Sequence, residues 1–389
     1  SNTISVSTTD NLNEYFFTAG ESPFTSPTTY YSVTGGGWQT PATWETSTDG
    51  VSFSPAVSQP GVDNPVIIRN GDVVTIPAIT LVTAASTSIE NTGVLDIQET
   101  DGSLYDISTV GGTGTLRFTV GATPDVPTLD NDFISAGGGT VEYAYTANRD
   151  LPTSQSTYNN LIISGTRRYN HRANYTINGN LSITTTDRVE DNGFTFSGTP
   201  SGTFTISSGA ELRVEGANSF PSGFGTYGLQ SGSLVRYNSN TAQTVASLDG
   251  DSYWDLQFSG NSTKTLNGDI IIDDDLTIDQ RSILSALSFN INIRGDWNRN
   301  SSNGSAFLPG TGTVVFDGTS AKEIDRINTS SAETFGNVTI NNSAGVSLDN
   351  GGAEVTQLDI TGNLTFTDGT LGLQNKPLTV SGNITNNSA

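Results

Sequence analysis

The chain repeats itself over long distances, and this repetition restricts its possible folds more than any other feature. The block GTVEY at 139–143 returns as SLVRY at 233–237 and as GTVVF at 312–316. Two further blocks recur in the same order: NLIISG at 160–165, DLQFSG at 255–260 and NVTIN at 337–341, and then INGNLSI at 177–183, IDDDLTI at 272–278 and ITGNLTF at 360–366. Such repetition indicates an array or a solenoid, in which each unit packs on its neighbours.

Short apolar pairs within the repeats indicate what each unit is. Near the C-terminus they recur every six or seven residues with Gly, Asn or Asp between them: Leu358/Ile360, Leu364/Phe366, Leu371/Leu373 and Leu378/Val380. Alternation suits a strand with one buried face, and Gly, Asn and Asp suit tight corners. Three such sides make a turn of roughly 20 residues, which predicts an all-β, right-handed parallel β-helix of ~17 to 18 turns and roughly 80 Å. A string of immunoglobulin-like sandwiches is the alternative, because ~90 residues is also a sandwich-sized unit.

The composition is consistent with a thin, shared core. Only 33% of the 389 residues are hydrophobic, and 43 are glycine. Stacked turns share their core and therefore need fewer apolar residues per length than a globular domain. We expect an N-terminal arm or cap over 1–33 and a β-helix over 34–389, in which a capping section precedes three super-repeats at roughly 138–230, 231–310 and 311–389. Trp38 and Trp44 are expected to plug the open end of the solenoid.

The charge and the missing residue types exclude several classes of partner. The chain has 39 acidic against 16 basic residues and a net charge of −23. Such a balance argues against nucleic acid and anionic membranes, and no apolar run approaches the ~18 residues that direct membrane insertion requires. With no cysteine, disulfides and thiolate sites are excluded. The absence of methionine indicates a processed or excised chain, so we expect a removed export signal and an extracellular or cell-surface location, in a protein that continues beyond 389.

Motifs in the N-terminal half resemble those of a known group of proteins. Gly37-Trp38 and Thr43-Trp44 are followed by DNPVII at 63–68 and NGDVVTI at 70–76. Together with the internal NL-x-I blocks, they resemble the repetitive β-helical secreted and cell-surface proteins of Bacteroidota. The resemblance implies export by the type IX secretion system and display at the outer surface. Members of that group range from adhesins to enzymes with appended β-helices, so the resemblance selects no single function.

Two groups of residues are candidates for ligand binding. The first is a basic island in this acidic chain, made by Arg167, Arg168, His171 and Arg172. It would hold an acidic sugar, or neutralise a uronate in a lyase; the alternative is local pairing with the acids at 187–191, one turn later. The second is Tyr253 and Trp254, which with Tyr237 would form a stacking platform for a sugar; the alternative is that these rings belong to the core.

The densest acidic run is a candidate calcium site. Asp269, Asp273 and Asp275, with Asp274 and Asp279 beside them, supply the oxygen ligands that Ca²⁺ prefers. The alternative is a structural corner. Asp274 aligns with Gly179 and Gly362 of the other super-repeats, which indicates a position that tolerates unusual φ. The spacing of an EF-hand loop is missing.

No catalytic motif stands out, and the function inferred from the sequence is mechanical. The chain lacks a G-x-S-x-G elbow and a phosphate-binding loop, and it has a single histidine. We expect a non-enzymatic, extracellular structural or adhesive segment of a larger secreted or surface protein, a rigid rod that presents loops to surface glycans or to copies of itself. One alternative is a module that binds or degrades polysaccharide. The other is a filament subunit joined end to end through its strand edges.

Overall fold

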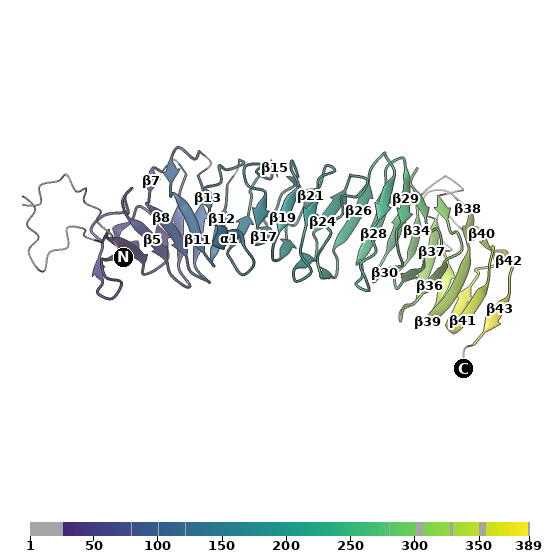
Figure 1. Cartoon of the computed structure of the whole chain (residues 1–389). Coiled ribbons are helices and arrows are strands. Elements are labelled where there is room, and N and C mark those ends of the chain that lie inside the picture. Colours follow the sequence, from purple (N-terminus) through teal and green to yellow (C-terminus); the bar gives the residue numbers. More distant parts are fainter. Residues whose placement is uncertain are drawn as a thin grey trace, which may run out of the picture.

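The chain forms an elongated rod in which short strands stack along one axis (Figure 1). The structure, a computed structural model, describes residues 26–78, 80–99, 101–120, 122–279, 281–300, 306–326, 330–349 and 355–387. The strands wind into a parallel β-solenoid of about 15 turns, which confirms the predicted β-helix. At about 4.8 Å per turn the stacked part is roughly 70 Å long. There are fewer turns than predicted because several are longer than 20 residues, as between Leu116 and its neighbour Val141, where α1 (Asn131–Ile134) is inserted.

Three long sheets form the faces of the rod, and smaller sheets fill the gaps between them. The seven-stranded sheet contains, in chain order, β1 (Thr29–Ser32), β3 (Trp44–Ser47), β4 (Ser54–Pro55), β5 (Pro65–Ile68), β8 (Ser86–Ile89), β11 (Thr109–Gly112) and β13 (Thr128–Leu129). The nine-stranded sheet contains β2 (Gly36–Gly37), β6 (Val73–Ile76), β9 (Val94–Ile97), β12 (Thr115–Phe118), β14 (Thr140–Tyr143), β17 (Asn160–Ile163), β20 (Leu181–Ile183), β23 (Thr203–Ile206) and β25 (Thr226–Leu229).

A fifteen-stranded sheet covers two sides of the C-terminal half of the rod, because it consists of two rows of strands that join at β39 (Asn337–Leu348). It contains β15 (Arg149–Asp150), β18 (Tyr169–Asn170), β21 (Arg188–Glu190), β24 (Glu211–Val214), β26 (Leu234–Asn238), β28 (Asp255–Ser259), β30 (Ile270–Ile272), β31 (Leu276–Ile278), β33 (Ile291–Ile293), β34 (Trp297–Arg299), β36 (Thr313–Phe316), β37 (Lys322–Arg326), β39 (Asn337–Leu348), β41 (Leu364–Gly372) and β43 (Ile384–Asn386). The smaller sheets contain β7 (Val82–Thr83), β10 (Tyr105–Asp106), β16 (Thr157–Tyr158), β19 (Tyr175–Ile177), β22 (Phe196–Ser197), β27 (Gln243–Val245), β29 (Thr263–Leu266), β32 (Ile283–Ser285), β35 (Phe307–Leu308), β38 (Ser331–Phe335), β40 (Val355–Ile360) and β42 (Leu378–Val380).

The strands stack in register, so each inward position continues as a column through successive turns. In the nine-stranded sheet Leu116, Val141 and Leu161 align, and all three are almost fully buried. The predicted apolar pairs supply these columns because alternate residues of a strand point to the same side. The columns merge into one hydrophobic core that extends from Tyr30 to Leu364.

The N-terminal end of the described chain differs from the rest of the rod. There β1 pairs with β3, and β3 with β4, in antiparallel fashion, whereas β1 pairs with β5 in parallel. Every other strand pair in the described ranges is parallel. Trp38 and Trp44 are buried beside these strands, and Trp44 Nε1 donates a hydrogen bond to the carbonyl of Trp38 at 2.7 Å. Of the predicted arm or cap over 1–33, residues 1–25 lie outside the described part, and β1 belongs to the seven-stranded sheet.

Asn and Asp side chains join successive turns at the corners. The Oδ1 of Asn160 accepts the backbone N–H of Asn180, one turn later, at 2.9 Å. Aspartates do the same further along: Asp255 Oδ1 accepts the N–H of Asp275 at 3.1 Å, and Asp275 Oδ1 accepts the N–H of Asp296 at 2.8 Å. A side-chain oxygen in one turn thus satisfies a backbone donor of the next.

The expectation of unusual φ at Asp274, Gly179 and Gly362 is wrong. None of these three residues has a positive φ. The glycines are needed for space: a Cβ on Gly179 would lie 2.6 Å from Oδ1 of Asn160, and one on Gly362 would lie 2.3 Å from Oδ1 of Asn337. Close packing against the corner asparagines therefore explains glycine at both positions.

The repeated sequence blocks do not occupy equivalent faces. The first block forms β14, in the nine-stranded sheet, and the second forms β26, in the fifteen-stranded sheet. At the level of β26 the nine-stranded sheet is continued by a different strand, β25. The repeated blocks therefore share a strand-and-corner pattern, but the first two lie on different sides of the solenoid.

Candidate ligand-binding site

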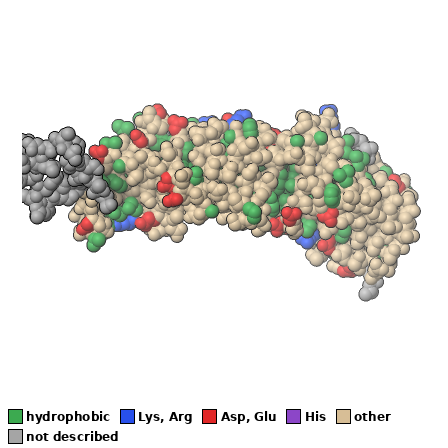
Figure 2. All heavy atoms as spheres, in the orientation of Figure 1, with side chains coloured by type: hydrophobic (Ala, Val, Ile, Leu, Met, Phe, Trp, Pro, Cys, Tyr) green, Lys and Arg blue, Asp and Glu red, His purple; other side chains and the backbone are tan. Residues whose placement is uncertain are grey.

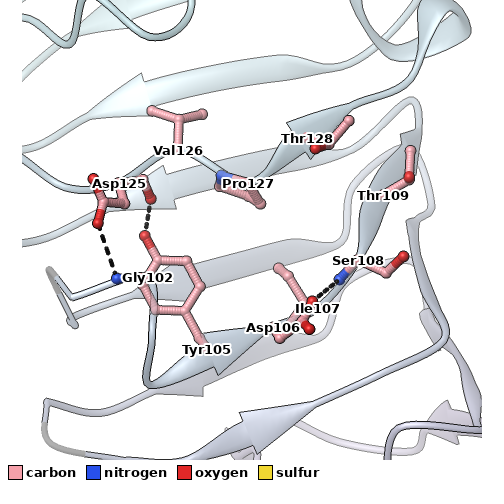
Figure 3. A pocket seen from close by; sticks show the side chains of 10 residues that line it. All are labelled: Gly102, Tyr105, Asp106, Ile107, Ser108, Thr109, Asp125, Val126, Pro127 and Thr128. Atoms are coloured by element: carbon pink, nitrogen blue, oxygen red, sulfur yellow. Dashed lines mark hydrogen bonds between the residues drawn. The ribbon is translucent and has the colours of Figure 1, made fainter.

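The surface of the described chain carries several shallow depressions. The one shown in Figure 3 has a volume of about 400 Å³ and lies beside β10, β11 and β13. Its polar groups bind other groups of the chain: Tyr105 donates its hydroxyl to the carbonyl of Asp125, the Asp125 carboxylate accepts the N–H of Gly102 at 3.1 Å, and Asp106 accepts the N–H of Ser108 at 3.3 Å (Figure 3). These groups stabilise the loops between turns.

A second depression, of about 480 Å³, is lined by the corner asparagines of the nine-stranded sheet. Asn159 Nδ2 donates to the carbonyl of Gly138 at 2.8 Å, and Asn178 Nδ2 donates to the carbonyl of Ile134 at 2.7 Å. These amides link one turn to another, so this depression also follows from the stacking itself.

A third depression, of about 320 Å³, combines an aromatic ring with charges of both signs. It is lined by Trp254, Asp273, Asp274, Arg294, Asp317, Lys322 and the loop 318–320. In the same region Figure 2 shows acidic and basic side chains gathered at the level of β30 and β36, on a surface that is otherwise mostly uncharged. We call this depression the Trp254 groove.

The strand register explains why these side chains meet. Ile272, Ile293 and Phe316 end three aligned strands, β30, β33 and β36. The residues that follow them, Asp273, Arg294 and Asp317, therefore stack one per turn. Tyr253 is bridged in parallel to Ile272, which places Trp254 one turn before Asp273.

Ion pairs hold the charged side chains of the groove. Arg294 forms an ion pair with Asp273 and lies 4.0 Å from Asp317, while Lys322 Nζ lies 3.5 Å from Asp274. Arg294 keeps 45% of its side-chain surface exposed, so its guanidinium can still donate to a ligand. With three carboxylates and two cations, the groove has a net charge of −1.

A row of half-buried aspartates lies directly behind the groove. Burial raises the pKa of Asp255 to about 6, and it also raises the pKa of Asp275. The neighbouring carboxylates of Asp274 and Asp275 add to the effect on Asp255, since like charges disfavour ionisation. This row titrates at a higher pH than ordinary carboxylates do.

The predicted basic island is divided between the surface and the interior. Arg168 pairs with Glu190, one turn later, at 3.6 Å, and Arg172 pairs with Asp150 at 2.8 Å. The expected pairing with the acids at 187–191 is confirmed for Arg168. The partner of Arg172 is instead Asp150, one turn earlier, and Arg167 is exposed and donates to the carbonyl of Thr146 at 3.2 Å.

His171 does not lie beside the arginines, and its predicted place on a binding loop is wrong. Its side chain is 0% exposed and packs edge-on against Phe196, with ring centroids 4.0 Å apart, and against Tyr175. Neither ring nitrogen has a hydrogen-bond partner among the described residues. Burial lowers the pKa of His171 to about 3, because the charged form would lose its hydration.

Of the predicted stacking platform, only Trp254 lies at the surface, whereas Tyr253 and Tyr237 lie in the core. Tyr253 is fully buried and its hydroxyl donates to the carbonyl of Ala246 at 2.7 Å, and Tyr237 is also buried. Their aromatic rings are inaccessible to a ligand. Trp254, the next residue, points outward and lines the groove.

The three predicted calcium ligands lie at separate positions. Asp269 binds the backbone and side-chain amides of Asn290 at 2.8 and 3.0 Å, Asp273 pairs with Arg294, and Asp275 accepts the N–H of Asp296. Within the described ranges no group of three acidic or histidine side chains is placed to hold a metal ion. Calcium binding stays a prediction from the sequence.

Sequence reasoning missed Arg294, Asp317 and Lys322 as members of the groove. The spacing in the sequence carried the signal. Arg294 directly follows the apolar pair Ile291/Ile293 and Asp317 directly follows Val314/Phe316, just as Asp273 follows Ile270/Ile272. Aligning these pairs turn by turn would have placed Asp273, Arg294 and Asp317 in one column.

Comparison with protein-family models, curated proteins and solved structures finds no match to this chain. Among the described residues there is also no helix with the length and apolar character needed to span a membrane.

Proposed function

We propose that this chain is a non-enzymatic structural and adhesive segment of a larger extracellular or cell-surface protein. In this role a stiff rod presents outward-facing side chains at one-turn intervals. The observation that supports the proposal is the single core from Tyr30 to Leu364, which joins all the intervening turns into one body. Backbone pairing between consecutive turns and the corner hydrogen bonds resist bending at every level.

A polysaccharide-binding module is the second candidate, and the Trp254 groove favours it. A partly exposed tryptophan next to alternating carboxylate and guanidinium groups offers an apolar face together with hydrogen-bond donors and acceptors. Adhesion to glycans would combine the two roles, because the rod would carry the groove away from the surface to which it is attached. The resemblance to Bacteroidota surface proteins supports the same location.

The test is co-sedimentation with insoluble polysaccharides, followed by an assay for newly released reducing ends. We expect the protein to enter the pellet and to release no reducing ends. Release of reducing ends would make the protein an enzyme and overturn the non-enzymatic role. A protein that stays in the supernatant with every polysaccharide would remove the adhesive role.

A further inference from the structure

The Trp254 side chain differs from the other three tryptophans of the chain. Trp38, Trp44 and Trp297 are 0 to 1% exposed and make ring contacts in the core. Trp254 is partly exposed, and its side chain makes no hydrogen bond or ring contact with the described residues. Part of its aromatic surface is thus left toward solvent, inside a depression lined by polar groups.

The column that begins at Trp254 alternates in hydrogen-bonding character. Asp273 follows it one turn later, then Arg294, Asp317 and Asn341, and Asn341 Nδ2 donates to Asp317 Oδ1 at 2.6 Å. Carboxylates accept, guanidinium donates and the amide does both, so consecutive turns offer the complementary groups that sugar hydroxyls need. The turn spacing of about 4.8 Å is close to the advance of an extended polysaccharide per pyranose ring.

The charge of the groove points to an uncharged ligand. Arg294 and Lys322 are each already paired with a carboxylate. Three carboxylates against two cations, in a chain of net charge −23, repel uronates and sulfated sugars.

We propose that the Trp254 groove binds a neutral, extended polysaccharide that lies along the rod axis. One pyranose ring stacks on Trp254, and the following rings donate hydrogen bonds to Asp273 and Asp317 and accept them from Arg294. This inference rests on the proposed adhesive function and assigns a site and a ligand class to it.

Because the other three tryptophans are buried, acrylamide quenching of intrinsic fluorescence reports chiefly on Trp254. The probes are soluble neutral glucans, mannans, xylans and galactans, with polygalacturonate as the acidic comparison. We expect at least one neutral polysaccharide to protect the fluorescence from acrylamide and polygalacturonate to give no protection.

Affinity electrophoresis through gels containing the same polysaccharides compares the variants. Trp254→Ala should weaken binding about tenfold, whereas Trp254→Phe, which keeps an aromatic face, should lose much less. Phe53→Ala is the matched control, because it removes a 39% exposed aromatic ring that packs on Tyr31 at the N-terminal end; its binding should be unchanged.

The outcomes separate the site from the broader function. Retardation that Trp254→Ala leaves unchanged would overturn the groove assignment while leaving adhesion intact. Binding to polygalacturonate alone would overturn the neutral ligand class. If no polysaccharide retards the protein or protects its fluorescence, both the groove and the adhesive function fail.

Discussion

A charged cluster inside the rod gives the sharpest prediction about stability. Glu333, on β38, is fully buried and accepts hydrogen bonds from Trp297 Nε1 at 3.2 Å, from Arg299 at 2.8 Å and from Arg326 at 3.1 Å. Both arginines are themselves 0 to 1% exposed. The carboxylate therefore neutralises positive charge that water cannot reach.

Glu333→Gln keeps the shape of the side chain and removes the negative charge. Removing one partner of a buried ion pair typically costs about 3 to 5 kcal/mol, because the remaining charge stays desolvated. Two charge-assisted hydrogen bonds, each contributing about 1.5 to 3 kcal/mol, give a similar sum. We expect the free energy of unfolding to fall by about 3 to 5 kcal/mol.

Urea unfolding followed by tryptophan fluorescence and circular dichroism measures the change. Trp297 lies in the cluster, so its fluorescence should change at lower urea in the variant. Glu323→Gln on β37 is the matched control: Glu323 is largely exposed, and its pKa is raised by desolvation and by repulsion from the carboxylates of Asp349 and Asp296. This control should be unchanged or slightly more stable. A Glu333→Gln protein within 1 kcal/mol of the wild type would refute the view that the buried charge needs its partner.

Two further predictions concern a buried ring and a close backbone contact. The pKa of His171 falls from 6.5 to about 3 on folding, so this residue takes up its proton at a higher pH in the unfolded chain than in the folded one. Protonation of the unfolded chain should therefore lower the free energy of unfolding of the wild type by up to roughly 5 kcal/mol between pH 6.5 and 3. His171→Phe should abolish that part of the pH dependence and raise the free energy of unfolding at pH 7 by about 1 to 3 kcal/mol. Urea midpoints measured at pH 7, 5 and 4 that shift in parallel for the two proteins would contradict this prediction. Gly295→Ala should destabilise by about 1 to 3 kcal/mol, because the new Cβ would lie 2.0 Å from the backbone of Asp274. Gly61→Ala, whose Cβ would meet only an ordinary contact at 3.4 Å, is the control, and equal thermal midpoints for the two variants would exclude the clash.

Much of the fold could be predicted because its signal is local. Alternating apolar pairs such as Leu364/Phe366 specify which face of a strand is buried, and Gly, Asn and Asp mark the corners. The number of turns could not be predicted, since inserted segments such as α1 look like ordinary corners in the sequence.

Alternation decides which residues of the segment 168–172 reach the surface, whereas Arg167 lies before it and is exposed although it has the parity of Tyr169. Tyr169 and His171 share one parity and are buried, while Arg168 and Arg172 share the other and face outward. The run RYNHR at 168–172 therefore contained this information, although its charge made the whole segment look exposed.

The buried charges could not be predicted. Arg299 occupies an inward position, as the alternation with Trp297 implies, but an arginine there is read as a surface residue unless its partner is known. That partner, Glu333, is 34 residues away and is brought close only by the stacking of the turns.

The in-register stacking of turns is the claim on which the groove and the rod both depend, and spin-label distances test it most directly. The chain has no cysteine, so pairs of cysteines can be introduced at outward positions of one face without background. Thr75 and Ser182 are five aligned turns apart, and Thr75 and Thr205 are six. Stacked turns predict narrow distance distributions near 24 and 29 Å, that is, about 4.8 Å more for each added turn. Broad distributions, or distances that do not increase by about one strand spacing per turn, would contradict the solenoid and everything derived from its register.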